Sequence, residues 1–310
     1  MREAIPLIER STQLEVEKRQ TVGLVFCACR DDHISIKLRK CGILPVCMAL
    51  CLIASLILPY ISMVAKKVLP AFLPLVSDTG GSPPSSGVFA ICLILASFFG
   101  FITFPILYFN IKHRNVNDSK YIRLANKLLM LFSSISCLGL TITGAFPVGY
   151  TDIPNMFEWF TAVLWEHCLG AIMIFGGAFV FQLLVTIMWW YLPGTSRRAA
   201  YIRIPFICIY ILLFFIAAYP LPNMLLELLG QNPFDFARMK NRVYDIPREY
   251  SVNYLICSFC EYSLCAMSAL FIGMFYKDMQ NVSLRIVLRH KSCVTEFEEP
   301  APSIKLKNIS

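Results

Sequence analysis

Six long apolar stretches constrain this chain more than any other feature of its sequence. They run approximately over Ile43–Ala65, Val88–Asn110, Leu124–Pro147, Cys168–Leu192, Ile204–Leu226 and Asn253–Tyr276. A helix that crosses about 30 Å of hydrocarbon needs roughly 20 mostly apolar residues, and each stretch reaches that length. A membrane β-barrel would need alternating segments of roughly ten residues instead. The sequence therefore predicts an all-α polytopic membrane protein with six transmembrane helices, because only helices satisfy the backbone of such stretches in lipid.

The composition agrees with a membrane protein and excludes other classes. Hydrophobic residues make up 57% of the 310 residues and charged residues 15%, whereas average globular chains carry about 45–50% and about 25%. A water-soluble domain of this size could not cover so much apolar surface. The same high apolar content and low charged content exclude a disordered chain, a coiled coil and a disulfide scaffold.

Basic residues predict the orientation of the helices. Of the 28 Lys and Arg residues, 22 lie in the two tails and near the loops after the second and fourth stretches, with Lys127 counted, and 6 lie in the other three loops. By the positive-inside rule, both termini are expected to be cytosolic. The chain then divides into a cytosolic N-terminal tail (1–42), a six-helix transmembrane domain (43–277) and a cytosolic C-terminal tail (278–310).

The net charge of +8 is thereby assigned to the cytosolic face. Membrane lipids are the expected partners there, because anionic head groups attract Lys and Arg. No basic segment is long enough, or interleaved with aromatic residues as nucleic-acid binding requires, so we expect no nucleic-acid partner. The sequence indicates no oligomeric state.

The sequence contains no motif of an enzyme or cofactor site. It has no nucleophile–base pair, phosphate-binding glycine loop, Walker motif or metal triad. Cys27, Cys29, His33 and Cys41 are a group of potential metal ligands, but their spacing fits no usual zinc pattern. We therefore expect no catalytic residue, no metal and no cofactor, and only a lipid-remodelling activity stays open.

Three ionisable residues are candidates for a ligand-binding site. Glu261 lies about two turns into the sixth stretch, and His167 begins the fourth, so both are expected toward the non-cytosolic half, where they could approach each other. Asp78, in the first non-cytosolic loop, would join them. Ionisable groups inside a membrane are functional hypotheses because their burial is costly. The alternative is a structural hydrogen bond that fixes helix packing.

Aromatic and small residues indicate how the fourth stretch is placed. The expected anchors at head-group depth are Trp159 and Trp165 at one end of the stretch and Trp189, Trp190 and Tyr191 at the other. Gly170, Gly176 and Gly177 are expected to allow a neighbouring helix to approach closely.

The N-terminal tail contains a pattern typical of an acidic dileucine sorting signal. Glu3 is followed by Leu7 and Ile8 on the side predicted to be cytosolic, where sorting adaptors would bind. Alternating apolar residues at positions 22, 24 and 26, and again at 34, 36 and 38, fit either a small hairpin or a segment that lies on the membrane surface.

Several segments together resemble one family of membrane proteins. Residues 76–87 (VSDTGGSPPSSG) are similar to the first loop of the damage-regulated autophagy modulators (DRAM). Residues 167–171 (HCLGA), 260–262 (CEY) and 277–286 (KDMQNVSLRI) resemble the fourth helix, the last helix and the exit of that family. The resemblance extends over about residues 43–290, which is nearly all of the membrane part.

The resemblance implies a six-helix lysosomal or endosomal protein that promotes autophagy without a known catalytic reaction. The wider superfamily also holds the CWH-type N-terminal domain, Golgi factors that remodel GPI lipids, and Sfk- and TMEM-type plasma-membrane proteins that organise a phosphoinositide kinase. We favour a non-enzymatic modulator of autophagy or of lysosomal membrane and lipid state. The alternatives are a Golgi lipid-remodelling factor with a lumenal polar site, and a plasma-membrane kinase scaffold that would depend on Arg285, Arg289 and Lys291.

Overall fold

Six long helices dominate the computed structural model, which describes residues 24–28, 33–69, 71–149, 160–195, 197–221, 223 and 252–289. The helices are α2 (Ile43–Ala65), α4 (Ser85–Arg114), α5 (Lys120–Ala145), α7 (Trp165–Tyr191), α8 (Arg197–Ala218) and α11 (Val252–Gly273). In the described residues, these six elements, with short extensions of α7 and α11, are long and apolar enough to cross a membrane. The predicted all-α, six-span fold is therefore confirmed.

Three short helices accompany the long ones. They are α3 (Val76–Thr79) between α2 and α4, the π-helix η1 (Phe160–Leu164) that leads into α7, and α12 (Phe275–Met279) that follows α11. The first of these lies in the segment that the sequence predicted as the first non-cytosolic loop.

The observed helices extend beyond several predicted bounds. The first stretch matches α2 residue for residue, but α4 runs four residues past Asn110, and α8 begins at Arg197 rather than at Ile204. Apolar content marks only the part of a helix that lies in hydrocarbon, whereas the hydrogen-bonded backbone continues into the polar interface. Basic residues at these extensions, including Lys112 and Arg198, suit the interface.

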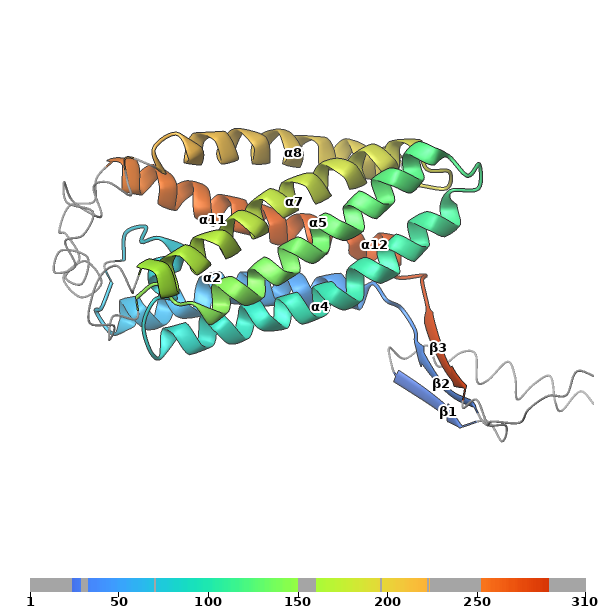
Figure 1. Ribbon diagram of the computed structural model, residues 1–310, viewed down its shortest axis with the longest axis horizontal. Helices are drawn as coiled ribbons and strands as arrows, with labels where there is room; N and C mark the ends of the chain where they lie inside the picture. The colour runs from blue at the N-terminus through green and yellow to red at the C-terminus, as the bar shows by residue number, and fades with distance from the viewer. Residues whose placement is uncertain are drawn as a thin grey trace, which may run out of the picture. The chain divides into compact units, whose positions relative to one another are not determined.

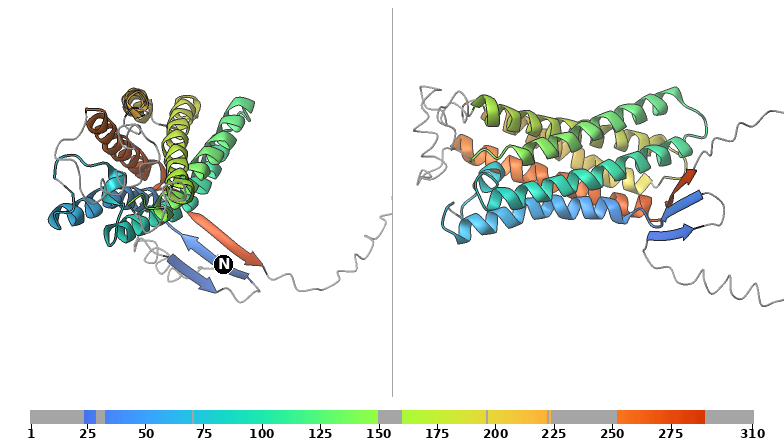
Figure 2. Two further views of the ribbon diagram at one scale, coloured as in Figure 1. Left: turned by 60° about the vertical axis from the view of Figure 1, so that its left-hand side comes forward. Right: turned by 60° about the horizontal axis from the view of Figure 1, so that its bottom comes forward.

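The six helices form a closed ring in the order α2, α4, α5, α7, α8 and α11 (Figures 1 and 2). Helices that follow one another along the chain pack side by side, and α11 closes the ring against α2. Residues 40–43 and 279–282 lie at one end of this bundle, which we call the terminal end. The short helix α3 lies at the opposite end, which we call the loop end.

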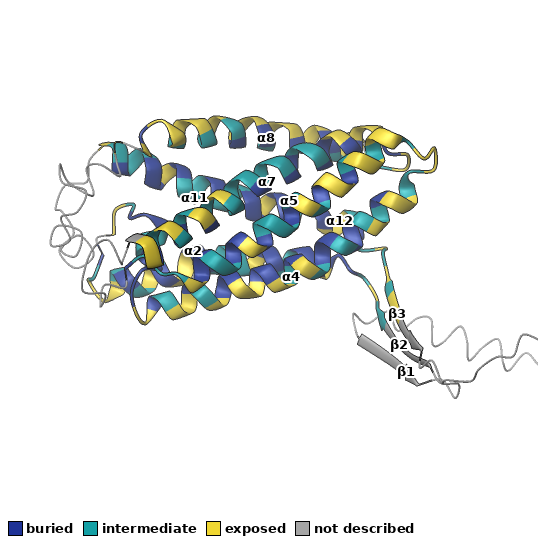
Figure 3. Cartoon of the chain, viewed as in Figure 1, coloured by how far each residue is buried: buried dark blue, intermediate teal, exposed yellow. Residues whose placement is uncertain are grey.

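Apolar side chains cover the outside of the bundle as well as its interior. Exposed positions follow the outward faces of the helices, and α8 is exposed along much of its length (Figure 3). Large apolar side chains such as Leu50, Ile91 and Phe215 are among the exposed residues. A surface of this kind suits a hydrocarbon environment and not water.

A small sheet forms a second unit with residues 1–39 and 283–310, separate from the bundle unit of residues 40–282. Strands β1 (Leu24–Ala28) and β2 (His33–Leu38) pair as an antiparallel hairpin, which decides between the two interpretations of the N-terminal tail. Strand β3 (Leu284–Arg289) pairs antiparallel with β2, so that Leu38 faces Leu284. This third strand was not predicted from the sequence.

Candidate functional site

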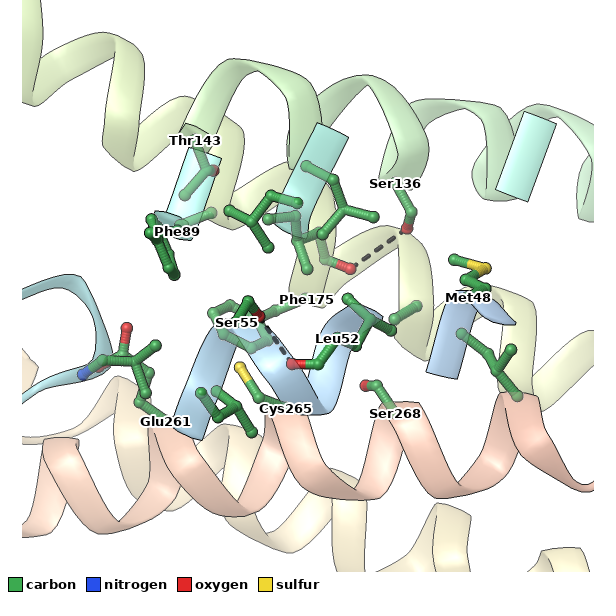
Figure 4. Close-up of a pocket in the computed structure, with 18 of the residues that line it drawn as sticks. Met48, Leu52, Ser55, Phe89, Ser136, Thr143, Phe175, Glu261, Cys265 and Ser268 are labelled. Atoms are coloured by element: carbon green, nitrogen blue, oxygen red, sulfur yellow. Dashed lines mark hydrogen bonds between the residues drawn. The ribbon is translucent and has the colours of Figure 1, made fainter. Parts of the chain in front are cut away.

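A cavity inside the helix ring is lined by residues of α2, α3, α4, α5, α7 and α11. Part of the cavity is open to the outside. Glu261 lies at one end of the cavity, and Met48 and Ser268 lie toward the other (Figure 4). Most of the remaining lining is apolar. The cavity therefore has an acidic end and an apolar length.

A stripe of polar residues on α11 holds the α3 segment in place at the acidic end. Tyr254, Ser258 and Glu261 are spaced i, i+4 and i+7, which places them on one face of the helix. The backbone amide of Val76 donates a hydrogen bond to Glu261 Oε2 over 2.9 Å. The amide of Leu75 donates to the Tyr254 hydroxyl oxygen, also over 2.9 Å.

The middle residue of the stripe binds the same segment through its carbonyl groups. The Ser258 hydroxyl oxygen is 2.8 Å from the carbonyl oxygens of both Leu73 and Pro74. Backbone groups outside regular structure are costly when they are buried in a membrane protein unless they find partners there. The stripe on α11 supplies those partners, so residues 73–76 can pack against the helix.

His167 and Thr143 complete the polar end of the cavity. His167, 6% exposed, is 2.8 Å through Nδ1 from the carbonyl oxygen of Phe146. A carbonyl oxygen only accepts, so Nδ1 carries the proton of this hydrogen bond. The Thr143 hydroxyl is buried and has no hydrogen-bond partner among the residues that the structure describes. Both residues line the cavity with Glu261.

Asp78 lies beside this end without lining the cavity. Its Oδ2 accepts a hydrogen bond of 2.6 Å from the Tyr254 hydroxyl, and its charge interacts with both Glu261 and His167. The structure thus brings together the three residues that the sequence analysis selected, from α3, α7 and α11. Their role in binding a ligand stays a prediction. Glu261 also forms a structural hydrogen bond, which it accepts from the Val76 amide.

Other predicted site residues cannot be placed in this way. Glu3, Leu7 and Ile8 of the predicted sorting signal lie outside the described residues. Within the described ranges, no three or more His, Cys, Asp or Glu side chains are grouped so that they could hold a metal ion.

A second charged cluster lies at the terminal end and was missed by the sequence analysis. Arg203 of α8 is 1% exposed and forms an ion pair with Asp278 of α12. Its guanidinium carbon lies 4.9 Å from the ring centre of Trp189 and 4.4 Å from that of Phe275. Within the described part of the chain, Nε and Nη1 of Arg203 have no hydrogen-bond partner, so these cation–π contacts replace such partners.

This cluster corrects two expectations from the sequence. Arg203 was counted as a loop charge because the apolar run begins one residue later, but it is buried inside the bundle. Trp189 was expected to anchor the helix at head-group depth, but it is fully buried against Arg203 and Phe275, whereas its neighbours Trp190 and Tyr191 are exposed. The burial of Arg203 and Trp189 is therefore decided by the ion pair and the aromatic contacts from other helices, and not by where these residues lie along an apolar stretch.

Glycines bring α5 and α7 close together beside the polar end. A Cβ atom on Gly170 would lie 2.5 Å from Thr143 Oγ1, and one on Gly139 would lie 2.7 Å from the Gly170 carbonyl oxygen. Gly177 is equally tight against Ser136, whereas nothing lies within 4 Å of a Cβ on Gly176. The expected close approach is therefore made by Gly170 and Gly177 and not by Gly176.

The sequence did contain a signal for the stripe that was missed. The spacing of Tyr254, Ser258 and Glu261 can be read directly from an otherwise apolar helix, and a polar face inside a membrane bundle indicates a buried partner. That partner is the backbone of residues 73–76, which no side-chain pattern reveals.

Comparison with known proteins gives a family match over most of the chain. Residues 40–282 match the model of the family described as Frag1/DRAM/Sfk1/Cwh43P N-terminal domain. DNA damage-regulated autophagy modulator protein 1 of Xenopus laevis is 25% identical over 252 residues, which cover 80% of this chain and 95% of that protein.

Two further relatives carry similar names. Human DNA damage-regulated autophagy modulator protein 1 is 25% identical over 75% of this chain and 88% of its own length. DNA damage-regulated autophagy modulator protein 2 of Rattus norvegicus is 26% identical over 47% of this chain and 49% of its own. No solved structure matches the chain.

Proposed function

We propose a function from the premise that this chain belongs to the Frag1/DRAM/Sfk1/Cwh43P N-terminal domain family: it is a non-enzymatic multi-pass membrane protein that modulates autophagy or the lipid state of lysosomal or endosomal membranes. The observation that carries the proposal is the similarity to an autophagy modulator over 95% of that protein's length. The partners we propose are membrane lipids and, at the N-terminal tail, sorting adaptors.

The three polar residues make contacts that hold the loop end together. Glu261 accepts from the Val76 amide, Asp78 accepts from the Tyr254 hydroxyl, and the His167 ring donates to the Phe146 carbonyl. Each contact fixes a segment of the loop end in place, as a binding or structural role requires.

The location of the protein is the first test of this proposal. We expect the full chain, tagged after Ser310, to colocalise with lysosomal markers. The double variant Leu7→Ala/Ile8→Ala should move to the cell surface, because it lacks both apolar residues of the sorting pattern. Leu14→Ala/Val16→Ala in the same tail is the matched control and should stay lysosomal. A parent protein in the Golgi or at the plasma membrane would contradict the proposal.

The second test measures autophagy itself. In cells that lack the protein, we expect a reduced rate of autophagic degradation under starvation, which returns when the full chain is expressed again. The L7A/I8A variant should restore it less well, because less of it reaches the lysosome. Unchanged degradation in cells without the protein, with no change in lysosomal lipids either, would contradict the proposed role.

A lipid-remodelling factor is the second candidate function, favoured by the cavity that reaches Glu261 and His167. If the protein has this function, it should reside in the Golgi, and cells that lack it should have GPI-anchored proteins with an altered lipid composition. Glu261→Gln keeps the size and an acceptor oxygen but removes the charge. If that variant is stable and correctly located but no longer restores the GPI lipids, remodelling at this site is the better account.

A further inference from the structure

We propose that the interior cavity binds one single-chain lipid with a protonated amine as its head group, the ammonium group at Glu261 and the alkyl chain along α11. The inference goes beyond the proposed function, since binding can be measured on the protein in isolation and does not depend on its organelle. Three features of the cavity carry it: the charge at one end, an unpartnered hydroxyl and the apolar length.

The charge at the polar end selects the head group. Glu261 borders the cavity with part of its surface accessible, and the charge of Asp78 lies close by. None of the described residues that line the cavity is Lys or Arg. A phosphate or carboxylate head group would therefore meet like charge without compensation, whereas an ammonium group would neutralise a buried carboxylate.

A hydroxyl at the same end supplies a free hydrogen-bonding group. Thr143 is 6% exposed, lines the cavity, and its Oγ1 has no partner among the described residues. Unpartnered polar atoms are rare in protein interiors and call for a ligand or a water.

The rest of the cavity suits a hydrocarbon chain. Of the serines on α2 and α5 that line it, Ser55, Ser133 and Ser136 each donate to a carbonyl of a helix and so offer little to a ligand. Ser268 of α11 also lines the cavity, and its hydroxyl has no hydrogen-bond partner among the described residues. Along α11 the wall runs from Glu261 to Ile272. Eleven helical residues span roughly 16 Å, which is about half of a hydrocarbon core of about 30 Å.

The length and the charge of the cavity together indicate one alkyl chain and not a phospholipid. Half of the hydrocarbon core is the depth that the chain of one lipid occupies in a bilayer, and the wall along α11 has about this length. A phospholipid would bring its phosphate to the acidic end, whereas a single-chain amine would not.

The binding test uses the full chain in nanodiscs of zwitterionic phospholipid. The probe is a long-chain primary amine that carries a photoreactive group and an alkyne in its alkyl chain. We expect saturable labelling of α5, α7 and α11 peptides. An unlabelled primary amine should compete well, the alcohol of equal chain length less well, and the carboxylic acid and alkyl phosphate least.

Two variants and a matched control locate the site. Glu261→Gln should weaken binding of the amine about tenfold or more, because a hydrogen bond to a charged group is lost, and should leave the weaker binding of the alcohol nearly unchanged. Ala178→Phe fills the apolar length and should lower labelling by both probes. Glu166→Gln removes a carboxylate that does not line the cavity, and it should bind like the parent.

Several outcomes would overturn the proposal. Labelling that appears only on the exposed face of α8 would show contact with bulk lipid alone. Equal competition by amine and carboxylic acid would exclude charge selection at the polar end. If Glu166→Gln weakened binding as much as Glu261→Gln, the effect would be one of net charge and not of this cavity. Binding that persists in Ala178→Phe would place the ligand elsewhere.

Discussion

The two ends of the bundle bury charged groups in different ways. At the loop end, Glu261 faces a backbone amide on one side and a cavity on the other. At the terminal end, Arg203 is enclosed by Asp278 and by the rings of Trp189 and Phe275. Glu261 therefore borders unfilled space, whereas Arg203 is surrounded by protein side chains. We infer that the first end is suited to a ligand and the second to holding helices together.

The largest effect should follow from breaking the ion pair at the terminal end. Arg203→Ala removes the pair and its ring contacts and leaves Asp278 without its cation, so we expect a loss of about 3–5 kcal/mol of unfolding free energy. Thermal unfolding of the detergent-solubilised protein measures it. Arg197→Ala, an exposed arginine of the same helix, is the control and should cost almost nothing. Equal stability of the two variants would contradict a stabilising role for the cluster.

A smaller effect should follow from separating α5 and α7 beside the cavity. Gly170→Ala places a methyl group 2.5 Å from Thr143 Oγ1, and we expect overpacking to destabilise the protein by about 1–3 kcal/mol. Gly176→Ala meets nothing within 4 Å and should stabilise by up to about 1 kcal/mol, because alanine favours the helix. The two variants should thus shift the melting temperature in opposite directions. Shifts of the same sign would mean that the close approach does not matter.

The stripe on α11 can be tested by a local measurement. Tyr254→Phe removes the hydroxyl that contacts the Leu75 amide and Asp78, so about 1–2 kcal/mol should be lost where a buried amide loses its partner. Hydrogen exchange should rise in residues 73–80 and stay unchanged in α12. Tyr121→Phe, at an exposed tyrosine, is the control. Faster exchange at both ends would indicate that the two ends are not independent.

The smallest effect on stability should come from the residue that matters most for the ligand. Glu261→Gln retains an acceptor oxygen for the Val76 amide, so we expect a change of less than about 1 kcal/mol in unfolding free energy. Combined with Arg203→Ala, its effect should be additive, because distant sites without shared partners act independently. A non-additive result from the double-mutant cycle would show that the two charged ends are coupled.

Much of the fold follows from length and hydropathy, because a membrane permits few alternatives. The first predicted span and α2 begin and end at the same residues, because the apolar stretch is not interrupted by charged residues near either end. At α8 the helix begins seven residues before the predicted Ile204. Hydropathy locates hydrocarbon, and it cannot show that a charged residue such as Arg203 is neutralised by groups that arrive from α7 and α12.

The candidate site was predictable in its residue types but not in its geometry. Asp78, His167 and Glu261 stand out because ionisable groups are rare in such helices. Their arrangement depends on residues 73–76 entering the bundle, and that segment is held through its backbone, which leaves no trace in side-chain patterns. The cavity depends on the sizes of side chains from six elements, so no single stretch of sequence indicates it.

The small sheet joins two strands that are synthesised far apart in time. Leu284 follows its partner Leu38 by 246 residues, and all six spans are synthesised between them. At about 5–20 residues per second, the hairpin of β1 and β2 spends roughly 10–50 s on the ribosome before β3 emerges. During that interval β2 presents an open edge to the surrounding proteins. Strand β2 can therefore gain its second partner only after all six spans have been synthesised, so the three-stranded sheet is completed after the last span.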